Sequence, residues 1–290
     1  AILKDLKAVE SLGAVSVICS DQTGTLTQNR MTVQKLWADG MLIDAENLSL
    51  ANEPQRLLVK IGLLASDATT NEAEGTSIGD PTEVALVQIG DALEVDETLY
   101  RQHHPRLQEL SFDSGRKLMS TLHMLDGQPT LLTKGAIDVL LQRADFLLTS
   151  SGAVPMTDER RAQIMQVNDT LSQDGLRVLA FAMRQLPEVR ELKFEDEAHF
   201  TFVGLVAMMD PPRPESVQAV ADAKRGGIRT VMITGDHKTT AAAIARQIGI
   251  FSDGDMALSG VELDAMDDAA LDKVLPKVAV YARVSPEHKI

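Results

Sequence analysis

The sequence predicts an α/β domain whose chain is interrupted by a second domain of mixed α and β structure. Two stretches point to the first domain: an apolar strand pattern that ends in a polar loop at Asp21, and an alternation of helix and strand patterns from Glu215 to Ile248. The chain between them shows hairpin and helix patterns of a different texture. We therefore expect residues 1–30 and 209–290 to form one discontinuous α/β domain, and residues 31–208 to form an inserted α+β domain.

Length and composition are those of a globular protein with two domains, because the chain has 290 residues that are 44% hydrophobic and 24% charged. The net charge of −14 argues against a nucleic-acid partner. Cys19 is the single cysteine, which excludes an internal disulfide. The longest apolar stretch, Phe200–Met209, is shorter than the roughly 20 residues that cross a bilayer, and no secretory signal pattern is visible. These features predict a soluble, cytoplasmic piece.

The first elements along the chain are a helix over residues 1–14 and a short strand over Val15–Cys19. The strand is almost unbroken in apolar residues, so we expect it to be buried on both faces of a parallel sheet. Asp21 follows where ligands bind on such sheets, and a carboxylate there can act as a nucleophile toward phosphorus. The alternative is that Asp21 caps a turn or a helix.

The inserted region begins with a hairpin over Val33–Ile43, which turns at Asp39 and Gly40. A helix over Glu53–Ala65 and a polar loop over Ser66–Ser77 follow. Asp80 suits the N-cap of the next helix and Pro81 its first position. Glu83 stands at the third position, where its side chain could reach back to the cap amide.

A strand pair is predicted over Leu110–Met124, with Phe112 placed close to Arg116 and Lys117. An aromatic face and two cations can hold a base and its phosphates, although a core position for Phe112 is the simpler interpretation. The remaining elements predicted for the insert are helices over Ile137–Ala144 and Asp158–Leu171, a helix-ending glycine at Gly175, and strands over Leu176–Ala182 and Thr201–Met208.

The prolines within Asp210–Pro214 exclude a regular helix or central strand there, so we interpret this segment as a hinge. After it, the α/β rhythm resumes. The predicted elements are a helix over Glu215–Lys224, a strand over Ile228–Ile233, a loop over Thr234–Asp236, a helix over Thr239–Ile248 and a strand over Val278–Tyr281.

The segment Ser20–Thr32 resembles the phosphorylation motif of the P-type ATPases, in which the Asp matching Asp21 accepts the γ-phosphate of ATP. The resemblance covers essentially the whole chain, with at least six motifs in the expected order, and is closest to the calcium-pump type. It implies a Rossmannoid phosphorylation domain of haloacid-dehalogenase-like fold. It also implies that the insert is a nucleotide-binding domain, with an antiparallel sheet flanked by helices.

The resemblance implies roles for individual residues. Mg²⁺ would bind the Asp21 carboxylate and the Thr23 carbonyl, Thr234 would bind the transferred phosphoryl group, and Lys289 would stabilise the aspartyl phosphate. The residues implied in nucleotide binding are Glu83, Phe112, Lys117, Lys134, Gly135, Arg177, Asp210, Gly235, Asp236 and Arg283. A domain closure would bring the γ-phosphate to Asp21.

This chain departs from the family pattern at three places. Gln22 stands where the family has Lys, and Ser114 stands where it has Arg. The sequence also stops before the Gly-Asp-Gly-x-Asn-Asp motif whose carboxylate completes the magnesium site. We therefore expect nucleotide binding with little phosphorylation of Asp21 by this chain as it stands.

The interpretation is that the chain is the cytoplasmic ATP-binding and autophosphorylating portion of a P-type pump for cations, of the calcium type. Its partners would be ATP and the transmembrane and actuator domains of the same pump, on the cytoplasmic side of a membrane. Two alternatives remain: a haloacid-dehalogenase-like phosphatase, in which the insert is a substrate cap, and a non-catalytic nucleotide-binding module.

Overall fold

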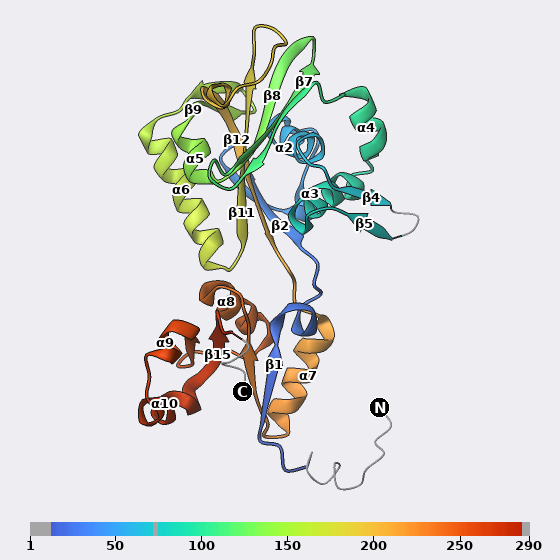
Figure 1. Cartoon of the computed structure of the whole chain (residues 1–290). Helices are drawn as coiled ribbons and strands as arrows, with labels where there is room; N and C mark the ends of the chain where they lie inside the picture. The colour runs from blue at the N-terminus through green and yellow to red at the C-terminus, as the bar shows by residue number, and fades with distance from the viewer. Residues whose placement is uncertain (1–12, 72–74, 286–290) are drawn as a thin grey trace. The chain divides into compact units, whose positions relative to one another are not determined.

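The computed structural model describes residues 13–71 and 75–285 (Figure 1). The predicted helix over residues 1–14 therefore falls largely outside the described residues. Contacts between Cα atoms divide the described chain into two units. Unit 1 holds the residues up to Arg30, Gln173–Gly175 and those from Asp210 onward, and unit 2 holds Met31–Ser172 and Leu176–Met209.

Unit 1 is built on a parallel sheet of four strands in the order β1-β13-β15-β14. Chain segments far apart in the sequence meet in it, because β1 pairs in parallel with β13. Its elements are β1 (Val17–Asp21), α7 (Pro214–Arg225), β13 (Arg229–Ile233), α8 (Lys238–Ile248), β14 (Met256–Ser259), α9 (Gly260–Asp264), α10 (Asp268–Val274) and β15 (Val278–Ala282).

The prediction that the first strand is buried on both faces is wrong for the described residues. β1 lies at the edge of the four-stranded sheet, and the side chains of Val17 and Ile18 are 46% and 41% exposed. An apolar run reports the β-propensity of the segment, whereas its burial depends on which strands and helices flank it. The strands predicted over residues 228–233 and 278–281 are confirmed as β13 and β15.

Unit 2 contains a nine-stranded, largely antiparallel sheet, in which β10-β9-β12-β11-β8-β7-β6 follow one another while β2 pairs with β12 and β3. Its strands are β2 (Thr32–Ala38), β3 (Met41–Asp44), β6 (Gln108–Asp113), β7 (Leu118–Leu125), β8 (Gln128–Gly135), β9 (Ala144–Thr149), β10 (Gly152–Pro155), β11 (Arg177–Gln185) and β12 (Phe200–Met209). The predicted mixed α and β architecture with an antiparallel sheet is confirmed.

Helices cover both faces of the unit 2 sheet (Figure 1). One core joins α2 and α3 to the sheet, around Leu58, Ile61 and Val87. The other joins α5 and α6 to the opposite face, around Leu140 and Ile164. The helices are α2 (Glu53–Leu64), α3 (Pro81–Ala92), α4 (Glu97–His103), α5 (Ile137–Gln142) and α6 (Asp158–Gln173).

Local signals predicted several turns and caps correctly. Asp39 and Gly40 both have positive φ, as a two-residue hairpin turn requires. Asp80 caps α3 by accepting a hydrogen bond from the Thr82 amide, and Gly175 has φ +80° after α6. The predicted loop over Ser66–Ser77 is wrong in part, because β4 (Thr69–Asn71) and β5 (Thr76–Ile78) pair within it.

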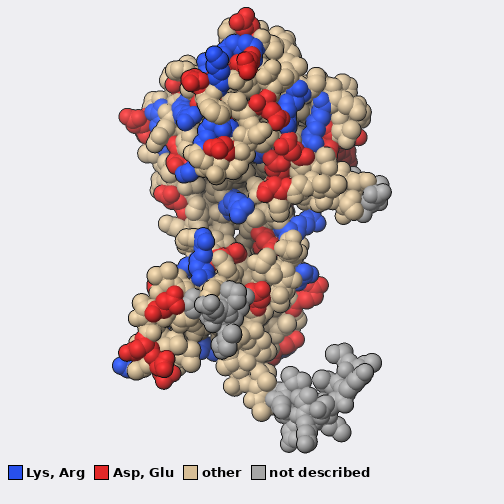
Figure 2. All heavy atoms as spheres, viewed as in Figure 1, with Lys and Arg blue, Asp and Glu red and all other residues tan. Residues whose placement is uncertain are grey.

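Acidic and basic side chains are interspersed over the visible face of unit 2 (Figure 2). Within residues 13–71 and 75–285, no helix is both long and apolar enough to span a bilayer.

One buried imidazole makes the stability of unit 2 depend on pH. His123 on β7 is 1% exposed, its Nδ1 donates to the His104 carbonyl at 2.9 Å, and its Nε2 accepts from Thr121 Oγ1 at 2.9 Å. Burial lowers the pKa of His123 to about 4. The unfolded chain, with a pKa near 6.5, therefore binds a proton that the folded chain excludes between these two values.

We predict that unit 2 loses about 2 kcal/mol of unfolding free energy through His123 when the pH falls from 7 to 5. Denaturant unfolding at both pH values measures the loss. His123→Gln should reduce this pH dependence, whereas His103→Gln, at an exposed position, should retain it. Equal pH dependence in the parent and in His123→Gln would contradict the prediction.

Candidate functional site

Two polar residues meet at the carboxyl edge of the parallel sheet in unit 1. Asp21 is the last residue of β1 and pairs with Ile233, the last residue of β13. Thr234 follows at once and is 1% exposed. Because parallel strands end at the same edge, Asp21 and Thr234 lie on neighbouring strand ends, where open α/β sheets bind their ligands.

Backbone hydrogen bonds hold the loops at this edge together. The Thr234 amide donates to the Tyr281 carbonyl at 2.9 Å, and the Arg283 amide donates to the Asp236 carbonyl at 3.1 Å. Thr234 Oγ1 accepts from the Asp236 amide at 3.0 Å. The segment Thr234–Asp236 is therefore joined to the segment after β15, which brings Gly235 and Arg283 to the edge that carries Asp21.

The loop after Asp21 is a tight turn over Gln22–Leu26 in which Gly24 has φ +74°. Thr27, which is fully buried, donates from Oγ1 to Asp210 Oδ2 at 2.5 Å, and the Arg30 amide donates to Asp210 Oδ1 at 3.0 Å. Asp210 thus connects the end of this loop to the segment that follows β12. The site residue Asp210 has a structural task whether or not it contacts a nucleotide.

Two residues support this loop that the sequence reasoning did not select. Thr27 contacts Asp210, and Arg213 donates from Nε to the Thr27 carbonyl at 2.8 Å and from Nη2 to the Gly24 carbonyl at 3.2 Å. Thr27 lies in the segment that resembles the phosphorylation motif and Arg213 in the predicted hinge, but a contact between segments so far apart in sequence carries no local signal.

Gln22 interacts with a second candidate residue. Its side chain is 1% exposed, and Nε2 donates to Asp236 Oδ2 at 2.7 Å. Oε1 is buried and has no hydrogen-bond partner within the described residues. The Asp236 carboxylate therefore receives a neutral amide donor from Gln22, where a lysine would have supplied a positive charge.

The oxygen donors at this edge suit a hard divalent cation such as Mg²⁺, which prefers carboxylate and carbonyl ligands. Asp21 would supply a carboxylate and Thr23 a backbone carbonyl. Among the described residues, no group of three or more His, Cys, Asp or Glu side chains is arranged to hold a metal ion. Lys289 lies outside the described residues.

In unit 2, Lys134 and Glu83 form a buried ion pair. Lys134 Nζ lies 2.6 Å from Glu83 Oε1 and also donates to the Ala65 carbonyl, while the side chains are 9% and 15% exposed. Glu83 Oε2 accepts from the amides of Asp67 and Ala68 at 2.8 and 3.1 Å. Burial lowers the pKa of Lys134, and the Glu83 carboxylate opposes that shift.

These contacts correct the sequence interpretation of Glu83. The sequence predicts that this carboxylate reaches back to the cap amide of α3, but it accepts hydrogen bonds from the Asp67 and Ala68 amides and from Lys134 Nζ. Glu83 binds these tertiary partners because the loop before β4 passes close to the start of α3. Gly79 marks that close approach, since a Cβ there would lie 2.7 Å from the Cα of Ala68.

Phe112 is 63% exposed at the end of β6, which excludes the alternative of a core position for its ring. Lys117, on the other side of the β6–β7 turn, has φ +59° and lies 3.8 Å from the Asp138 carboxylate. Gly135 packs directly against this turn, because a Cβ on it would meet the Lys117 carbonyl at 2.2 Å. Strand pairing places Asp113, Leu118 and Gly135 in one row across β6, β7 and β8.

Arg177, at the start of β11, donates from Nη1 to Thr82 Oγ1 at 3.0 Å. Thr82 precedes Glu83 on α3, which places Arg177 near the Lys134–Glu83 pair. Phe112, Lys117 and Gly135 group around the β6–β7 turn, and Glu83, Lys134 and Arg177 group around the start of α3. Lys134 and Gly135 are adjacent on β8, so the two groups are neighbours on unit 2.

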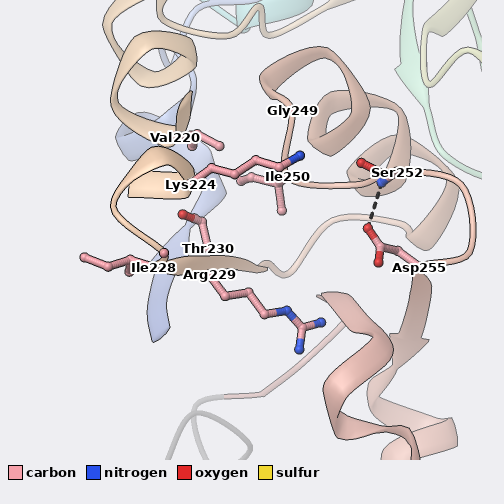
Figure 3. Close-up of a pocket in the computed structure, with 10 residues that line it drawn as sticks. Val220, Lys224, Ile228, Arg229, Thr230, Gly249, Ile250, Ser252 and Asp255 are labelled. Atoms are coloured by element: carbon pink, nitrogen blue, oxygen red, sulfur yellow. Dashed lines mark hydrogen bonds between the residues drawn. The ribbon is translucent and has the colours of Figure 1, made fainter. Parts of the chain in front are cut away.

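A cavity of about 430 Å³ also lies in unit 1 (Figure 3). It is lined by Lys224, Arg229, Thr230 and Asp255, among others, and the Ser252 amide donates to Asp255 at 2.8 Å. Arg229 and Thr230 begin β13, whereas Thr234 follows the end of that strand. The cavity is therefore at the opposite end of β13 from Asp21 and Thr234.

A family model described as "P-type ATPase, cytoplasmic domain N" matches residues 55–215. A calcium-transporting ATPase of Listeria monocytogenes is 46% identical over 297 residues, covering 100% of this chain and 33% of the relative. Calcium-transporting ATPases of Lactococcus lactis and Saccharomyces cerevisiae are 45% and 38% identical, each over 100% of this chain and 33% of the relative.

The family model covers more than half of the chain, and the relatives named as calcium-transporting ATPases match it over its whole length. The chain belongs to the P-type ATPase family. It spans about a third of the length of the curated relatives that it matches.

We predict that Glu83→Gln destabilises unit 2 by about 3 to 5 kcal/mol at pH 7, because it leaves the Lys134 ammonium buried without its counter-charge. The loss should shrink as the pH rises toward 10. Burial lowers the pKa of Lys134 below 10.5, so the folded protein releases the Lys134 proton at a lower pH than the unfolded chain does. The cost of burying the charge therefore falls as the pH rises toward 10.5.

Denaturant unfolding of the parent and the variant at pH 7 and at pH 9.5 measures both effects. Glu109→Gln is the matched control, because it removes a carboxylate that is 45% exposed in a surface pair with Arg106. A Glu83→Gln variant that is as stable as the parent at pH 7 would show that the ion pair does not support this part of the fold.

Proposed function

We propose that this chain is the ATP-binding and autophosphorylating portion of a P-type pump that transports cations, specifically calcium. The observation that carries the proposal is the placement of Asp21 and Thr234 on adjacent parallel strand ends, in a chain with relatives named as calcium-transporting ATPases. Residues 1–30 and 209–290 would be the phosphorylation domain, of haloacid-dehalogenase-like Rossmannoid fold. Residues 31–208 would be the nucleotide-binding domain.

Asp21 would be the nucleophile. A carboxylate oxygen attacks the γ-phosphorus of ATP, the bond from that phosphorus to the β–γ bridging oxygen breaks, and ADP leaves with the electron pair. The Thr234 hydroxyl and the Gly235 amide would donate to the transferred phosphoryl group, and Lys289 would neutralise part of its charge. Mg²⁺ bound by Asp21 and Thr23 would supply further charge neutralisation.

ATP would bind on unit 2. The exposed ring of Phe112 offers a face for stacking the base, and Lys117 lies at the other end of the same turn. Lys134, Glu83 and Arg177 would form the polar wall beside Gly135. Asp210, Asp236 and Arg283 belong to unit 1 and would contact the nucleotide only during phosphoryl transfer.

The whole protein would place these units on the cytoplasmic side of a membrane, coupled to transmembrane and actuator domains of the same chain. Those domains would couple ATP hydrolysis to transport, whereas the two units of this chain would bind ATP and accept its γ-phosphate.

One observation favours a second candidate, a non-catalytic nucleotide-binding module. Gln22 gives the Asp236 carboxylate a neutral donor. The sheet edge that would receive a phosphoryl group therefore carries one positive charge fewer than it would with a lysine at position 22. In that case unit 2 would bind ATP and Asp21 would stay unmodified.

We expect the chain to bind ATP and Phe112→Ala to weaken that binding by about one to two powers of ten, since stacking of a base is worth roughly 1 to 3 kcal/mol. Isothermal titration calorimetry measures the affinity. Phe146→Ala is the matched control, because Phe146 is also an exposed phenylalanine, 44% exposed on β9. Equal affinities of Phe112→Ala and the parent would remove Phe112 from the site.

In a full-length pump, we expect Gln22→Lys to raise the rate of aspartyl phosphate formation, because its ammonium would pair with Asp236 and add positive charge at the phosphoryl site. The measurement is hydroxylamine-sensitive labelling from γ-labelled ATP with saturating Mg²⁺. Asp21→Asn is the control that should abolish the label. Equal rates for Gln22→Lys and the parent would show that the amide serves as well as an ammonium.

A further inference from the structure

The buried ion pair of Arg116 and Glu197 lies next to the strand end that carries Phe112. The pairing of β6 with β7 shifts register between Leu110 and Asp113, so Ser111 and Phe112 lie in a bulge. A bulge redirects the side chains of its strand, and here Phe112 points into solvent with 63% of its surface exposed. Something must fix the bulge, because an exposed ring contributes little to its own position.

Arg116 makes the contacts that fix this bulge. Its Nη2 donates to the carbonyl of Ser111, the residue directly before Phe112, at 2.7 Å, and to the carbonyl of Leu118 at 3.0 Å. One guanidinium therefore links the outgoing end of β6 to the start of β7. The Arg116 amide also donates to Asp113 Oδ1 at 2.8 Å, which closes the turn.

Glu197 holds the Arg116 guanidinium in place. Its Oε2 lies 2.6 Å from Arg116 Nε, and the two side chains are 0% and 11% exposed. Its Oε1 accepts from Ser120 Oγ at 2.7 Å, and Ser120 in turn shares a hydrogen bond of 2.7 Å with Thr133. The other side of the guanidinium lies over the Phe194 ring, 4.8 Å from its centroid.

We propose that Glu197 is a positioning residue for nucleotide binding: through Arg116 it sets the backbone at Ser111 and thereby the orientation of the Phe112 ring. The proposal rests on the assignment of unit 2 as an ATP-binding domain. The Arg116 side chain is 11% exposed, forms an ion pair with Glu197 and donates from Nη2 to carbonyls of the turn, so it acts on the ligand through the turn.

The alternative is that the pair merely stabilises the fold. A buried carboxylate and guanidinium that lose one partner destabilise any protein, so loss of stability alone decides nothing. The two roles differ in what happens to the affinity of molecules that remain folded. If Glu197 acts through Phe112, its effect on ATP affinity must vanish once the ring is removed.

The experiment is a double-mutant cycle on ATP affinity with Glu197→Gln and Phe112→Ala, using the whole chain below its unfolding transition. Glu197→Gln should weaken ATP binding by about fivefold to tenfold in the parent background and by less than about twofold in the Phe112→Ala background. The melting temperature should fall by the same amount in both backgrounds. Additive effects on affinity, or an unchanged affinity, would overturn the proposal.

A neighbouring pair supplies the matched control. Asp196, the residue before Glu197, is 4% exposed. Its carboxylate accepts hydrogen bonds from Arg190 and from the Lys193 amide, neither of which belongs to the β6–β7 turn. Asp196→Asn should lower the melting temperature and leave the ATP affinity at the parent value. A loss of affinity equal to that of Glu197→Gln would mean that general destabilisation explains both variants.

If Glu197→Gln does not fold, Arg116→Lys answers the same question. A lysine keeps the charge beside Glu197 but lacks the planar fork that reaches the Ser111 and Leu118 carbonyls together. It should weaken ATP binding in the parent background alone, and a parent-like affinity would overturn the proposal. Absence of ATP binding by the parent would instead refute the proposed function, so the two failures are distinguishable.

Discussion

The parallel pairing of β1 with β13 is the constraint on which the candidate phosphorylation site depends. Val17–Asp21 and Arg229–Ile233 are separated in the sequence by residues 22–228, yet they pair residue for residue. The pairing brings Asp21 and Thr234 to the same edge of the sheet. It also requires the segments before and after unit 2 to run close together. They do so where Arg213 donates to the Thr27 carbonyl and Thr27 forms a β-bridge with Pro212.

Unit 2 uses buried charges for a different purpose. The pairs Lys134–Glu83 and Arg116–Glu197 each join a strand or turn of the sheet to a segment distant in sequence. Such pairs are costly to desolvate and contribute little net stability compared with apolar residues of the same shape. Their value lies in directional contacts, which hold the backbone around the exposed Phe112 and around the start of α3 in one arrangement.

Local sequence patterns predicted the elements that depend on local physics. The Asp39–Gly40 turn, the Asp80 cap and the helix of unit 2 after it follow from backbone preferences that act within a few residues. The candidate site was predicted mainly through resemblance to a family, because motif residues are widely separated. The burial of β1 and the partners of Glu83 were predicted wrongly, since both depend on segments distant in sequence.

Strand propensity, caps and motif residues are local properties, so the sequence alone is enough to assign the class of the protein, the order of most of its elements and its chemical groups. Which of these groups face solvent, and which contact one another, depends on tertiary packing. Phe112 is exposed at a bulge whose backbone accepts a hydrogen bond from Arg116. The Glu83 carboxylate accepts a hydrogen bond from the Ala68 amide because that loop passes close to it. These outcomes depend on long-range packing, which competes with local preference and here overrides it.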